Sequence, residues 1–406
     1  MNEDYTNREQ MEIDARNIAE EVDKLDSSDL PTANIMVAGI TGSGKSTLIN
    51  AVFGEDFAET GSGRPVTQNM NEYSNKDIPI RIWDTVGLEL DTATTQNSIR
   101  QMKEKIAEKS DSKNQFDRIH AIWYCVNSRS SRYQGAELDF IKSLHSIGVP
   151  FIIVLTQCIE DVDEVNAFER EIRRINENMG LNDIDVVQVC AKDFKMRGVP
   201  PIPAFGLDIL VDLTTKKLPA FIKNGFIAAQ RVSKIQKREL CEKTIIRCVQ
   251  EAKEGFWDKV FLANIRSANK RIKDMFRELG EIYNTQIPEE SIENIIETCR
   301  LDGKNIFWGL LSPIDFGYNK NVMQMLDSKK NEEGFSSIDP STFTKSDRVA
   351  VMVAFYGYTI IDSLEEVWET LTQSQLKNID MFCNEMIRII NRKLNERQKR
   401  AKQWQK

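Results

Sequence analysis

The chain has 406 residues, 41% of them hydrophobic, so it is long enough to bury a core and to form two domains. Its formal net charge is −8, and its seven cysteines are scattered without C-x-x-C spacing, as is typical of reduced thiols. The first residues are acidic and polar, unlike a secretory signal, and the longest apolar run, Val349–Ile361, is shorter than the roughly 20 residues of a membrane helix. We therefore expect a globular cytoplasmic protein.

Two hydropathy patterns divide the chain. From residue 31 to 218, short β-branched runs alternate with amphipathic stretches, which predicts an α/β domain with a mostly parallel, doubly wound sheet. From 219 to 406 the patterns are long and helical, which predicts an all-α domain containing a polar loop at 317–347. Residues 1–30 are expected to form an amphipathic helix. The strands are expected at 34–40, 78–85, 118–127, 150–157 and 184–192.

The stretch GITGSGKST follows the first expected strand and opens a helical pattern, and it has the spacing G-x-x-x-x-G-K-[ST]. Such a glycine-rich turn exposes backbone N–H groups to phosphates, and the helix N-terminus adds partial positive charge. Lys45 is expected to reach the β and γ phosphates, and Ser46 to ligate Mg²⁺. The residues expected to contact the phosphates are Gly39, Thr41, Gly42, Ser43, Gly44, Lys45, Ser46 and Thr47.

Two later elements suit the same site. An apolar strand ends at Asp84, whose carboxylate can hold magnesium through water, and Gly87 can offer its N–H to a γ-phosphate. Between the two motifs, GSGRPVTQNM is expected to be a polar loop. Its Thr67 either completes the magnesium shell when a γ-phosphate is present or is an ordinary loop threonine.

The order GITGSGKST, PVTQ, DTVG, TQC and CAK resembles the motifs of the GTPase superfamily, in its Era-like and septin-like branch. The resemblance covers residues 33–218 and implies a switch that binds GTP or GDP with Mg²⁺, with Lys45, Thr67 and Gly87 acting on the γ-phosphate. It implies a magnesium set of Ser46, Thr67 and Asp84. It also implies base-binding loops that contain Thr156, Gln157, Cys158, Ala191 and Lys192. The part beyond residue 218 is similar to the helical domains of unknown function that follow such domains.

The base loop departs from the family pattern. GTPases read guanine with [NT]-K-x-D, but Gln157 and Ile159 replace the lysine and the aspartate here. The N–H of Ala191 remains for guanine O6. Glu160 or Asp161 could supply the missing carboxylate, or could cap the next helix. An ATP-using switch therefore stays an alternative, although the L-S-G-G-Q signature of ABC-type ATPases is absent from the sequence.

The hydrolytic position also departs from the pattern, because Leu88 stands where Ras-like GTPases place a glutamine that orients water. Hydrolysis is expected to be slow unless another group assists it, and the resemblance implies that a homodimer across the nucleotide face or another partner does so. Arg64, Arg129 and Arg132 could contact a neighbouring nucleotide or could form surface ion pairs. Gly42 replaces an asparagine with which some Era-like members hold potassium, so potassium activation is not expected. An assembly scaffold that binds nucleotide with negligible turnover is the second alternative.

The helical half has a separate charge pattern. Residues 216–281 carry more Lys and Arg than Asp and Glu, in a chain of net negative charge. This suits either an acidic protein partner or anionic membrane surface, or an ordinary solvated helix face. Nucleic acid is not expected as a partner, because no aromatic-interleaved basic motif occurs.

Overall fold

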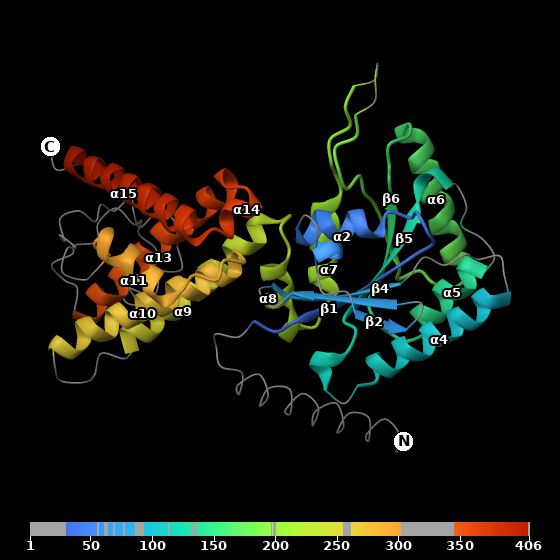
Figure 1. Ribbon diagram of the computed structural model, residues 1–406, viewed down its shortest axis with the longest axis horizontal. Helices are drawn as coiled ribbons and strands as arrows, with labels where there is room; N and C mark the ends of the chain where they lie inside the picture. Colours follow the sequence, from blue (N-terminus) through green and yellow to red (C-terminus); the bar gives the residue numbers. More distant parts are fainter. Residues whose placement is uncertain are drawn as a thin grey trace, which may run out of the picture. The chain divides into compact units, whose positions relative to one another are not determined.

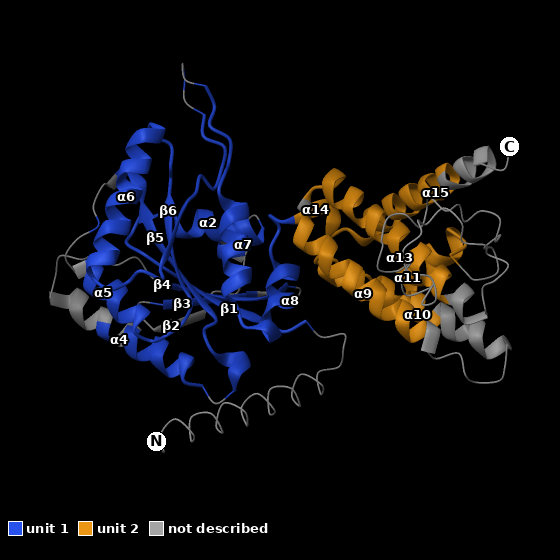
Figure 2. Cartoon of the chain, turned by 180° about the vertical axis from the view of Figure 1, so that it is seen from behind, with its two compact units in different colours: residues 1–233 blue, residues 234–406 orange. Residues whose placement is uncertain are grey.

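The computed structural model describes residues 30–54, 57–60, 64–67, 70–75, 78–85, 93–112, 114–130, 133, 136–195, 197, 200–254, 261–301 and 345–404. Contacts divide the chain into two compact units, residues 1–233 and residues 234–406 (Figure 2). Of the helix expected at 1–30, the structure describes only residue 30. Of the loop expected at 317–347, it describes only residues 345–347.

The first unit is built on a seven-stranded sheet of order β2-β3-β4-β1-β5-β6-β7 (Figure 1). Strands β4, β1, β5, β6 and β7 are parallel, whereas β2 and β3 run antiparallel to their neighbours. The strands are β1 (Ala33–Ala38), β2 (Arg64–Thr67), β3 (Met70–Asn75), β4 (Ile78–Thr85), β5 (Ala121–Asn127), β6 (Phe151–Thr156) and β7 (Asp185–Gln188). The expected mostly parallel sheet is confirmed.

Helices cover both faces of this sheet, because alternate residues of each central strand point to opposite sides. Met36 and Tyr124 belong to a core beneath α4 (Ala93–Ser110), α5 (Ala136–His145) and α6 (Val162–Asn178). Ile35 and Trp123 belong to the opposite core, beneath α2 (Lys45–Phe53), α7 (Leu207–Lys217) and α8 (Ala220–Ala229). The short helices are α3 (Phe57–Thr60), η1 (Gln115–Asp117) and η2 (Ser128–Ser130). The sheet is therefore doubly wound, as expected.

The expectation of a polar loop across GSGRPVTQNM is wrong in part. Residues 64–67 form the edge strand β2, and the polar stretch that follows residue 69 forms β3, which was not expected at all. Strand β3 pairs with β4 over its whole length. Its sequence, MNEYSN, has little of the apolar alternation that marks a strand, so the partner strand decides its conformation.

The boundary between the units lies after Ser233, whereas the sequence suggested that the helical part begins at residue 219. Helix α8 belongs to the first unit because its Phe226 packs edge-on against Phe53 and Trp123, with ring centroids 6.2 and 6.4 Å away. Its helical pattern resembled that of the helices after it. Only the packing of α8 assigns it to the first unit and not to the helical unit.

The second unit is all helical in its described part, as expected. Its helices are α9 (Lys234–Glu254), α10 (Phe261–Ile282), α11 (Glu289–Thr298), α13 (Lys345–Thr370), α14 (Gln373–Leu376) and α15 (Ile379–Trp404). The run Val349–Ile361 lies in α13, where Val351, Val353 and Ile360 are fully buried. No helix in the described ranges is both long and apolar enough to cross a membrane. All seven cysteines are unpaired and buried.

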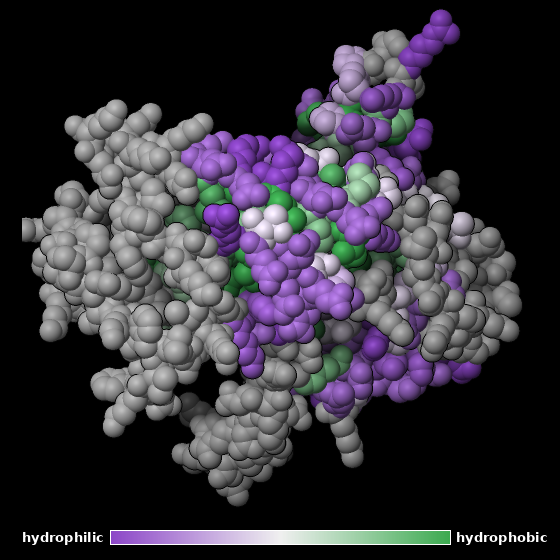
Figure 3. All heavy atoms as spheres, turned by 60° about the vertical axis from the view of Figure 1, so that its left-hand side comes forward, coloured by the Kyte–Doolittle hydropathy of each residue, from purple (hydrophilic) through white to green (hydrophobic). Residues whose placement is uncertain are grey.

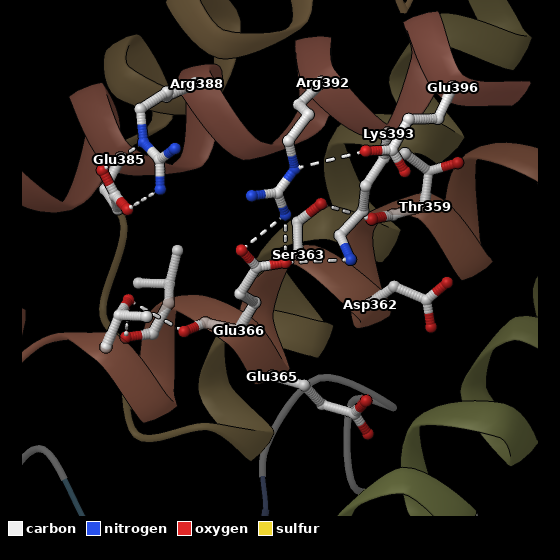
Figure 4. Close-up of polar contacts among 12 residues, drawn as sticks. Thr359, Asp362, Ser363, Glu365, Glu366, Glu385, Arg388, Arg392, Lys393 and Glu396 are labelled. Carbon is white, nitrogen blue, oxygen red and sulfur yellow. Dashed lines mark hydrogen bonds and ion pairs between the residues drawn. The ribbon is translucent and has the colours of Figure 1, made fainter. Parts of the chain in front are cut away.

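Basic residues of the second unit are largely paired with acids of the same unit. Figure 4 shows Glu366 of α13 between Arg392 and Lys393 of α15, with closest N–O distances of 2.5 and 3.1 Å. Burial opposes the charge of Glu366, but the hydrogen bonds from Arg392 and Lys393 outweigh it and lower the pKa. Further pairs join Arg238 to Asp362 and Glu365, Arg247 to Glu278, and Lys273 to Glu293.

The first unit contains a buried carboxyl that no base among the described residues neutralises. Glu137, at the start of α5, is 4% exposed and accepts a hydrogen bond from the Tyr124 hydroxyl at 3.0 Å. Burial raises the pKa of Glu137 to about 7, although the hydrogen bond from Tyr124 opposes the rise. The folded state therefore favours the protonated form, and its stability falls as the pH rises from the ordinary range of a carboxyl through about 7.

We predict that Glu137→Gln removes this pH dependence. At pH 8 the variant should have a free energy of unfolding roughly 2–3 kcal/mol above that of the parent, because it carries no buried charge, and at pH 4.5 the two should agree closely. Urea unfolding at both pH values, monitored by pulsed hydrogen exchange of β5 peptides, measures the free energy of unfolding. Parallel pH profiles of parent and variant would contradict it.

Candidate nucleotide-binding site

The turn between β1 and α2 lies at the carboxyl end of the parallel strands, where ligands of open α/β sheets bind. Thr41, Gly42 and Ser46 are exposed along it, whereas Ser43 and Lys45 are buried. Helix α2 begins at Lys45, so its free backbone N–H groups and partial positive charge face this turn. The motif and its flanking elements are arranged as the sequence predicted.

Glycine is required where the turn leaves β1. Gly39 has φ +146°, and a Cβ there would lie 2.4 Å from the carbonyl oxygen of Cys125 in β5. A backbone atom cannot move aside as a flexible side chain can. The first glycine of the motif therefore lets the turn pass directly over β5.

Lys45 is held inside the turn by its own backbone. Its Nζ donates hydrogen bonds to the carbonyl oxygens of Gly39 at 3.0 Å and Ile40 at 3.3 Å, and the residue is only 8% exposed. Carbonyl oxygens leave the positive charge of the ammonium uncompensated. The group is therefore positioned to attract an anion.

Asp84 at the end of β4 is the nearest source of negative charge. It is 7% exposed, and its Oδ1 atom has no hydrogen-bond partner among the described residues. Burial raises the pKa of Asp84 to about 6, and the nearby charge of Lys45 partly opposes this rise. A buried carboxylate oxygen without a donor suits a hydrated divalent cation, and Ser46 adds an exposed hydroxyl at the start of α2. The residues present fit Mg²⁺.

Of the other two residues expected at the γ-phosphate, Thr67 is described, and its strand does not bring it to this point. Thr67 ends the edge strand β2 and pairs with Met70, three strands away from β1 in the sheet order. Gly87 and Leu88 lie outside the described residues, as does Arg132.

Side chains from the ends of β5 and β6 hold the turn from outside. Thr156 donates its hydroxyl to the carbonyl oxygen of Ser43 at 2.6 Å, and the Gln157 amide donates to that of Gly42 at 2.9 Å. The Asn127 amide also donates to Gly42, at 3.4 Å. Gln157 has φ +54°, a backbone conformation that turns the chain back toward the phosphate turn. The sequence reasoning missed Asn127, whose position at the end of a central parallel strand was the available signal.

The loop after β6 offers no free carboxylate in its described atoms. Glu160 accepts a hydrogen bond from Ser128 at 2.9 Å and pairs with Arg129 at 3.1 Å. Asp161 is the N-cap of α6 and accepts from the N–H of Asp163. The capping role considered for Asp161 is thus observed, and the Arg129 side chain is engaged in a surface ion pair. Ile159 is half-buried.

The loop after β7 runs beside the β6 loop, because the N–H of Cys158 donates to the carbonyl oxygen of Val189 at 3.3 Å. Ala191 is half-buried against the α2-side core, and Lys192 is exposed. The chain then forms an arm, residues 190–206, whose two sides are joined by the isolated antiparallel bridges Cys190–Phe205 and Phe194–Ile202. Figure 1 shows the arm projecting from the first unit beyond α2.

The chain resembles known proteins in this region. Residues 34–157 match the family described as 50S ribosome-binding GTPase. Interferon-inducible GTPase 1 of Mus musculus is 22% identical over 263 residues, which are 61% of this chain and 57% of that protein. T-cell-specific guanine nucleotide triphosphate-binding protein 2 of Mus musculus is 22% identical over 288 residues, 66% of this chain and 64% of that protein. The match thus spans less than two thirds of each relative.

Solved structures are similar only over part of the chain. The probable GTP-binding protein EngB is 18% identical, with 47% of this chain and 99% of that chain covered and a TM-score of 0.32. Era of Aquifex aeolicus bound to GDP and AlF4⁻ is 15% identical, with 55% and 68% covered and a TM-score of 0.31.

The phosphate and magnesium residues of the candidate site lie in the part of the chain that matches the GTPase family. The glycine-rich turn, with the buried ammonium of Lys45, lies at the carboxyl end of a doubly wound sheet. The family match covers this turn together with β4, β5 and β6. Residues 34–157 thus match a GTPase family and contain a P-loop motif, and they lie in an α/β unit that precedes an all-helical unit in the chain.

Proposed function

We propose that this chain binds GTP with Mg²⁺ and hydrolyses it, and that the bound nucleotide switches the protein between two states. The observation that carries the proposal is the buried Oδ1 of Asp84, which has no hydrogen-bond partner among the described residues, near the buried ammonium of Lys45 at the amino end of α2. One group suits the cation and the other the phosphates that a magnesium nucleotide presents together.

Different residues would contact the phosphates, the magnesium ion and the base. The backbone of Gly39–Thr47 would cradle the phosphates, and Lys45 would exchange its carbonyl partners for β and γ oxygens. Ser46 and Asp84, joined by Thr67 in the triphosphate state, would hold Mg²⁺, which supplies charge neutralisation when bound. Gly87 would donate its N–H to the γ-phosphate. Thr156, Gln157 and Cys158, with Ala191 and Lys192, would form the base site.

Hydrolysis by an isolated chain should be slow. Leu88 follows the D-x-x-G glycine and cannot orient water through a side-chain amide. We infer that a second copy of this chain, meeting the first across the nucleotide face, assists the reaction. Such an arrangement needs a self-complementary surface around the base loops.

The described residues around those loops offer such a surface. Val162, Phe205 and Ile209 are 70, 39 and 53% exposed, which is high for large apolar side chains. Lys192, Lys195 and Arg197 are exposed on the arm, while Asp161, Asp163 and Glu164 are exposed at the start of α6. Figure 3 shows the arm standing out from the surface with a hydrophilic tip. Charges of both signs would allow two copies to pair by symmetry.

Two other roles receive less support. A scaffold with negligible turnover is favoured only by Leu88. Binding of the helical unit to an acidic partner or anionic membrane needs free basic groups, whereas Arg238, Arg247 and Arg392 are engaged with acids of their own unit. We therefore place the partner surface on the G domain.

Lys45→Ala should weaken nucleotide binding by about 2–4 kcal/mol, because charge-assisted hydrogen bonds are each worth about 1.5–3 kcal/mol. Calorimetric titration with GDP and with a non-hydrolysable GTP analogue measures the loss. Lys142→Ala removes an exposed lysine of α5 and should bind as the parent does. Equal affinities for the Lys45 variant and the parent would refute the phosphate assignment.

Assisted hydrolysis should make phosphate release per molecule rise with protein concentration. Ile209→Glu puts a charge into the exposed apolar surface and should abolish that rise while leaving nucleotide affinity unchanged. Ile235→Glu is the matched control, because Ile235 is 72% exposed on the helical unit. A rate per molecule that stays constant across concentrations would argue against the dimer, and no turnover at any concentration would favour the scaffold.

Ile159→Asp should sharpen the choice of base. Guanine presents two donors to a carboxylate at this position and adenine only one, and charge-assisted hydrogen bonds are worth about 1.5–3 kcal/mol each. We expect discrimination against ATP to rise by about tenfold or more. Competition of ATP and GTP for one labelled nucleotide, with Ile159→Asn as the uncharged control, measures it. A parent that already excludes ATP, together with a variant that loses GTP, would place the base reader elsewhere.

A further inference from the structure

The arm, residues 190–206, carries a proline-rich segment that neither the phosphate site nor the base site uses. Its residues 200–206 read PPIPAFG, and Pro200, Pro201 and Pro203 are all exposed. Figure 1 shows the arm projecting from the first unit, away from its sheet. Exposed apolar rings on a projecting arm are suited to contact with another molecule.

The backbone N–H groups of this segment all face into the arm. The three prolines have no N–H to donate. The other N–H groups of residues 200–205 donate across the arm: Ile202 to the Phe194 carbonyl oxygen at 2.9 Å, Ala204 to Asp193 Oδ1 at 3.0 Å, and Phe205 to the Cys190 carbonyl oxygen at 3.0 Å. The outer edge of the segment therefore has no donor with which to complete a β-ladder to an added strand. A partner must recognise it by its side chains.

The spacing of the side chains suits the polyproline II conformation. The proline ring fixes φ near −65°, which favours this left-handed helix of three residues per turn. Residues three apart share one edge of such a helix, about 9 Å from each other at a rise of about 3.1 Å per residue. Pro200 and Pro203 have this spacing, and Arg197, which is also exposed, stands three residues before Pro200. The chain thus has the pattern R-x-x-P-x-x-P.

We propose that Arg197, Pro200 and Pro203 bind an SH3-type domain, which offers a groove lined by aromatic side chains with a carboxylate at one end. The aromatic rings contact the two prolines, and the carboxylate pairs with the Arg197 guanidinium. Lys192 and Lys195 are exposed on the same arm and add positive charge toward an acidic partner. Because the prolines already restrict the free segment, binding orders little backbone. This partner goes beyond the proposed function and needs no nucleotide.

Titration of the full chain into an isotopically labelled SH3 domain that takes R-x-x-P-x-x-P peptides tests the proposal by NMR. The resonances of the groove should shift. Pro203→Ala and Arg197→Glu should each weaken binding by about tenfold or more, because one removes a ring from the groove and the other reverses the charge. Pro201→Ala is the matched control, because Pro201 lies on another edge of the polyproline helix, and its affinity should stay within about twofold of the parent's.

The possible outcomes are distinct. Urea unfolding first shows whether each variant is as stable as the parent, and Pro200→Ala repeats the test at the other groove position. Equal affinities of the parent, Pro203→Ala and Arg197→Glu overturn the proposal, and so does an absence of groove shifts across a panel of such domains. If the variants change only the sedimentation of the chain by itself, the segment contacts a second copy and the SH3 assignment is wrong. A chain that binds the domain but no nucleotide instead refutes the proposed function.

Discussion

The close passage of the phosphate turn over β5 is the constraint on which the site depends. A Cβ at Gly39 would approach the Cys125 carbonyl to 2.4 Å, so the backbone itself fills the space beside β5. This places the carbonyls of Gly39 and Ile40 within reach of the Lys45 ammonium, and those of Gly42 and Ser43 within reach of Gln157 and Thr156. Because these carbonyls accept their hydrogen bonds from side chains, the N–H groups at the start of α2 remain available to an anion.

The electrostatics follow from that packing. Lys45 is surrounded by carbonyl dipoles, and Asp84 is buried with an oxygen that lacks a donor, so both groups are poorly satisfied by the protein alone. Burial raises the pKa of Asp84 to about 6, because the charged carboxylate loses its contact with water. In the proposed function, Mg²⁺ would pair with Asp84 and the phosphates would pair with Lys45.

The two units use charge differently. In the helical unit, acids and bases pair across helices, as Glu366 does with Arg392 and Lys393, and as Arg238 of the basic stretch 216–281 does with Asp362 and Glu365. In the first unit, Val162, Phe205 and Ile209 are exposed, as are charged residues of both signs on the arm and at the start of α6.

The sequence by itself determined the phosphate turn, the central parallel strands and the helical character of the second half, because each follows from the local spacing of residues or from hydropathy periodicity. Only the tertiary structure decided that β3 is a strand, that β2 holds Thr67 at the sheet edge, and that α8 belongs to the first unit. It also decided that Glu160 pairs with Arg129 and that Gln157 closes onto Gly42. These features depend on residues far apart in the chain, since strand pairing and side-chain partners come from neighbours in space, which a local pattern does not encode.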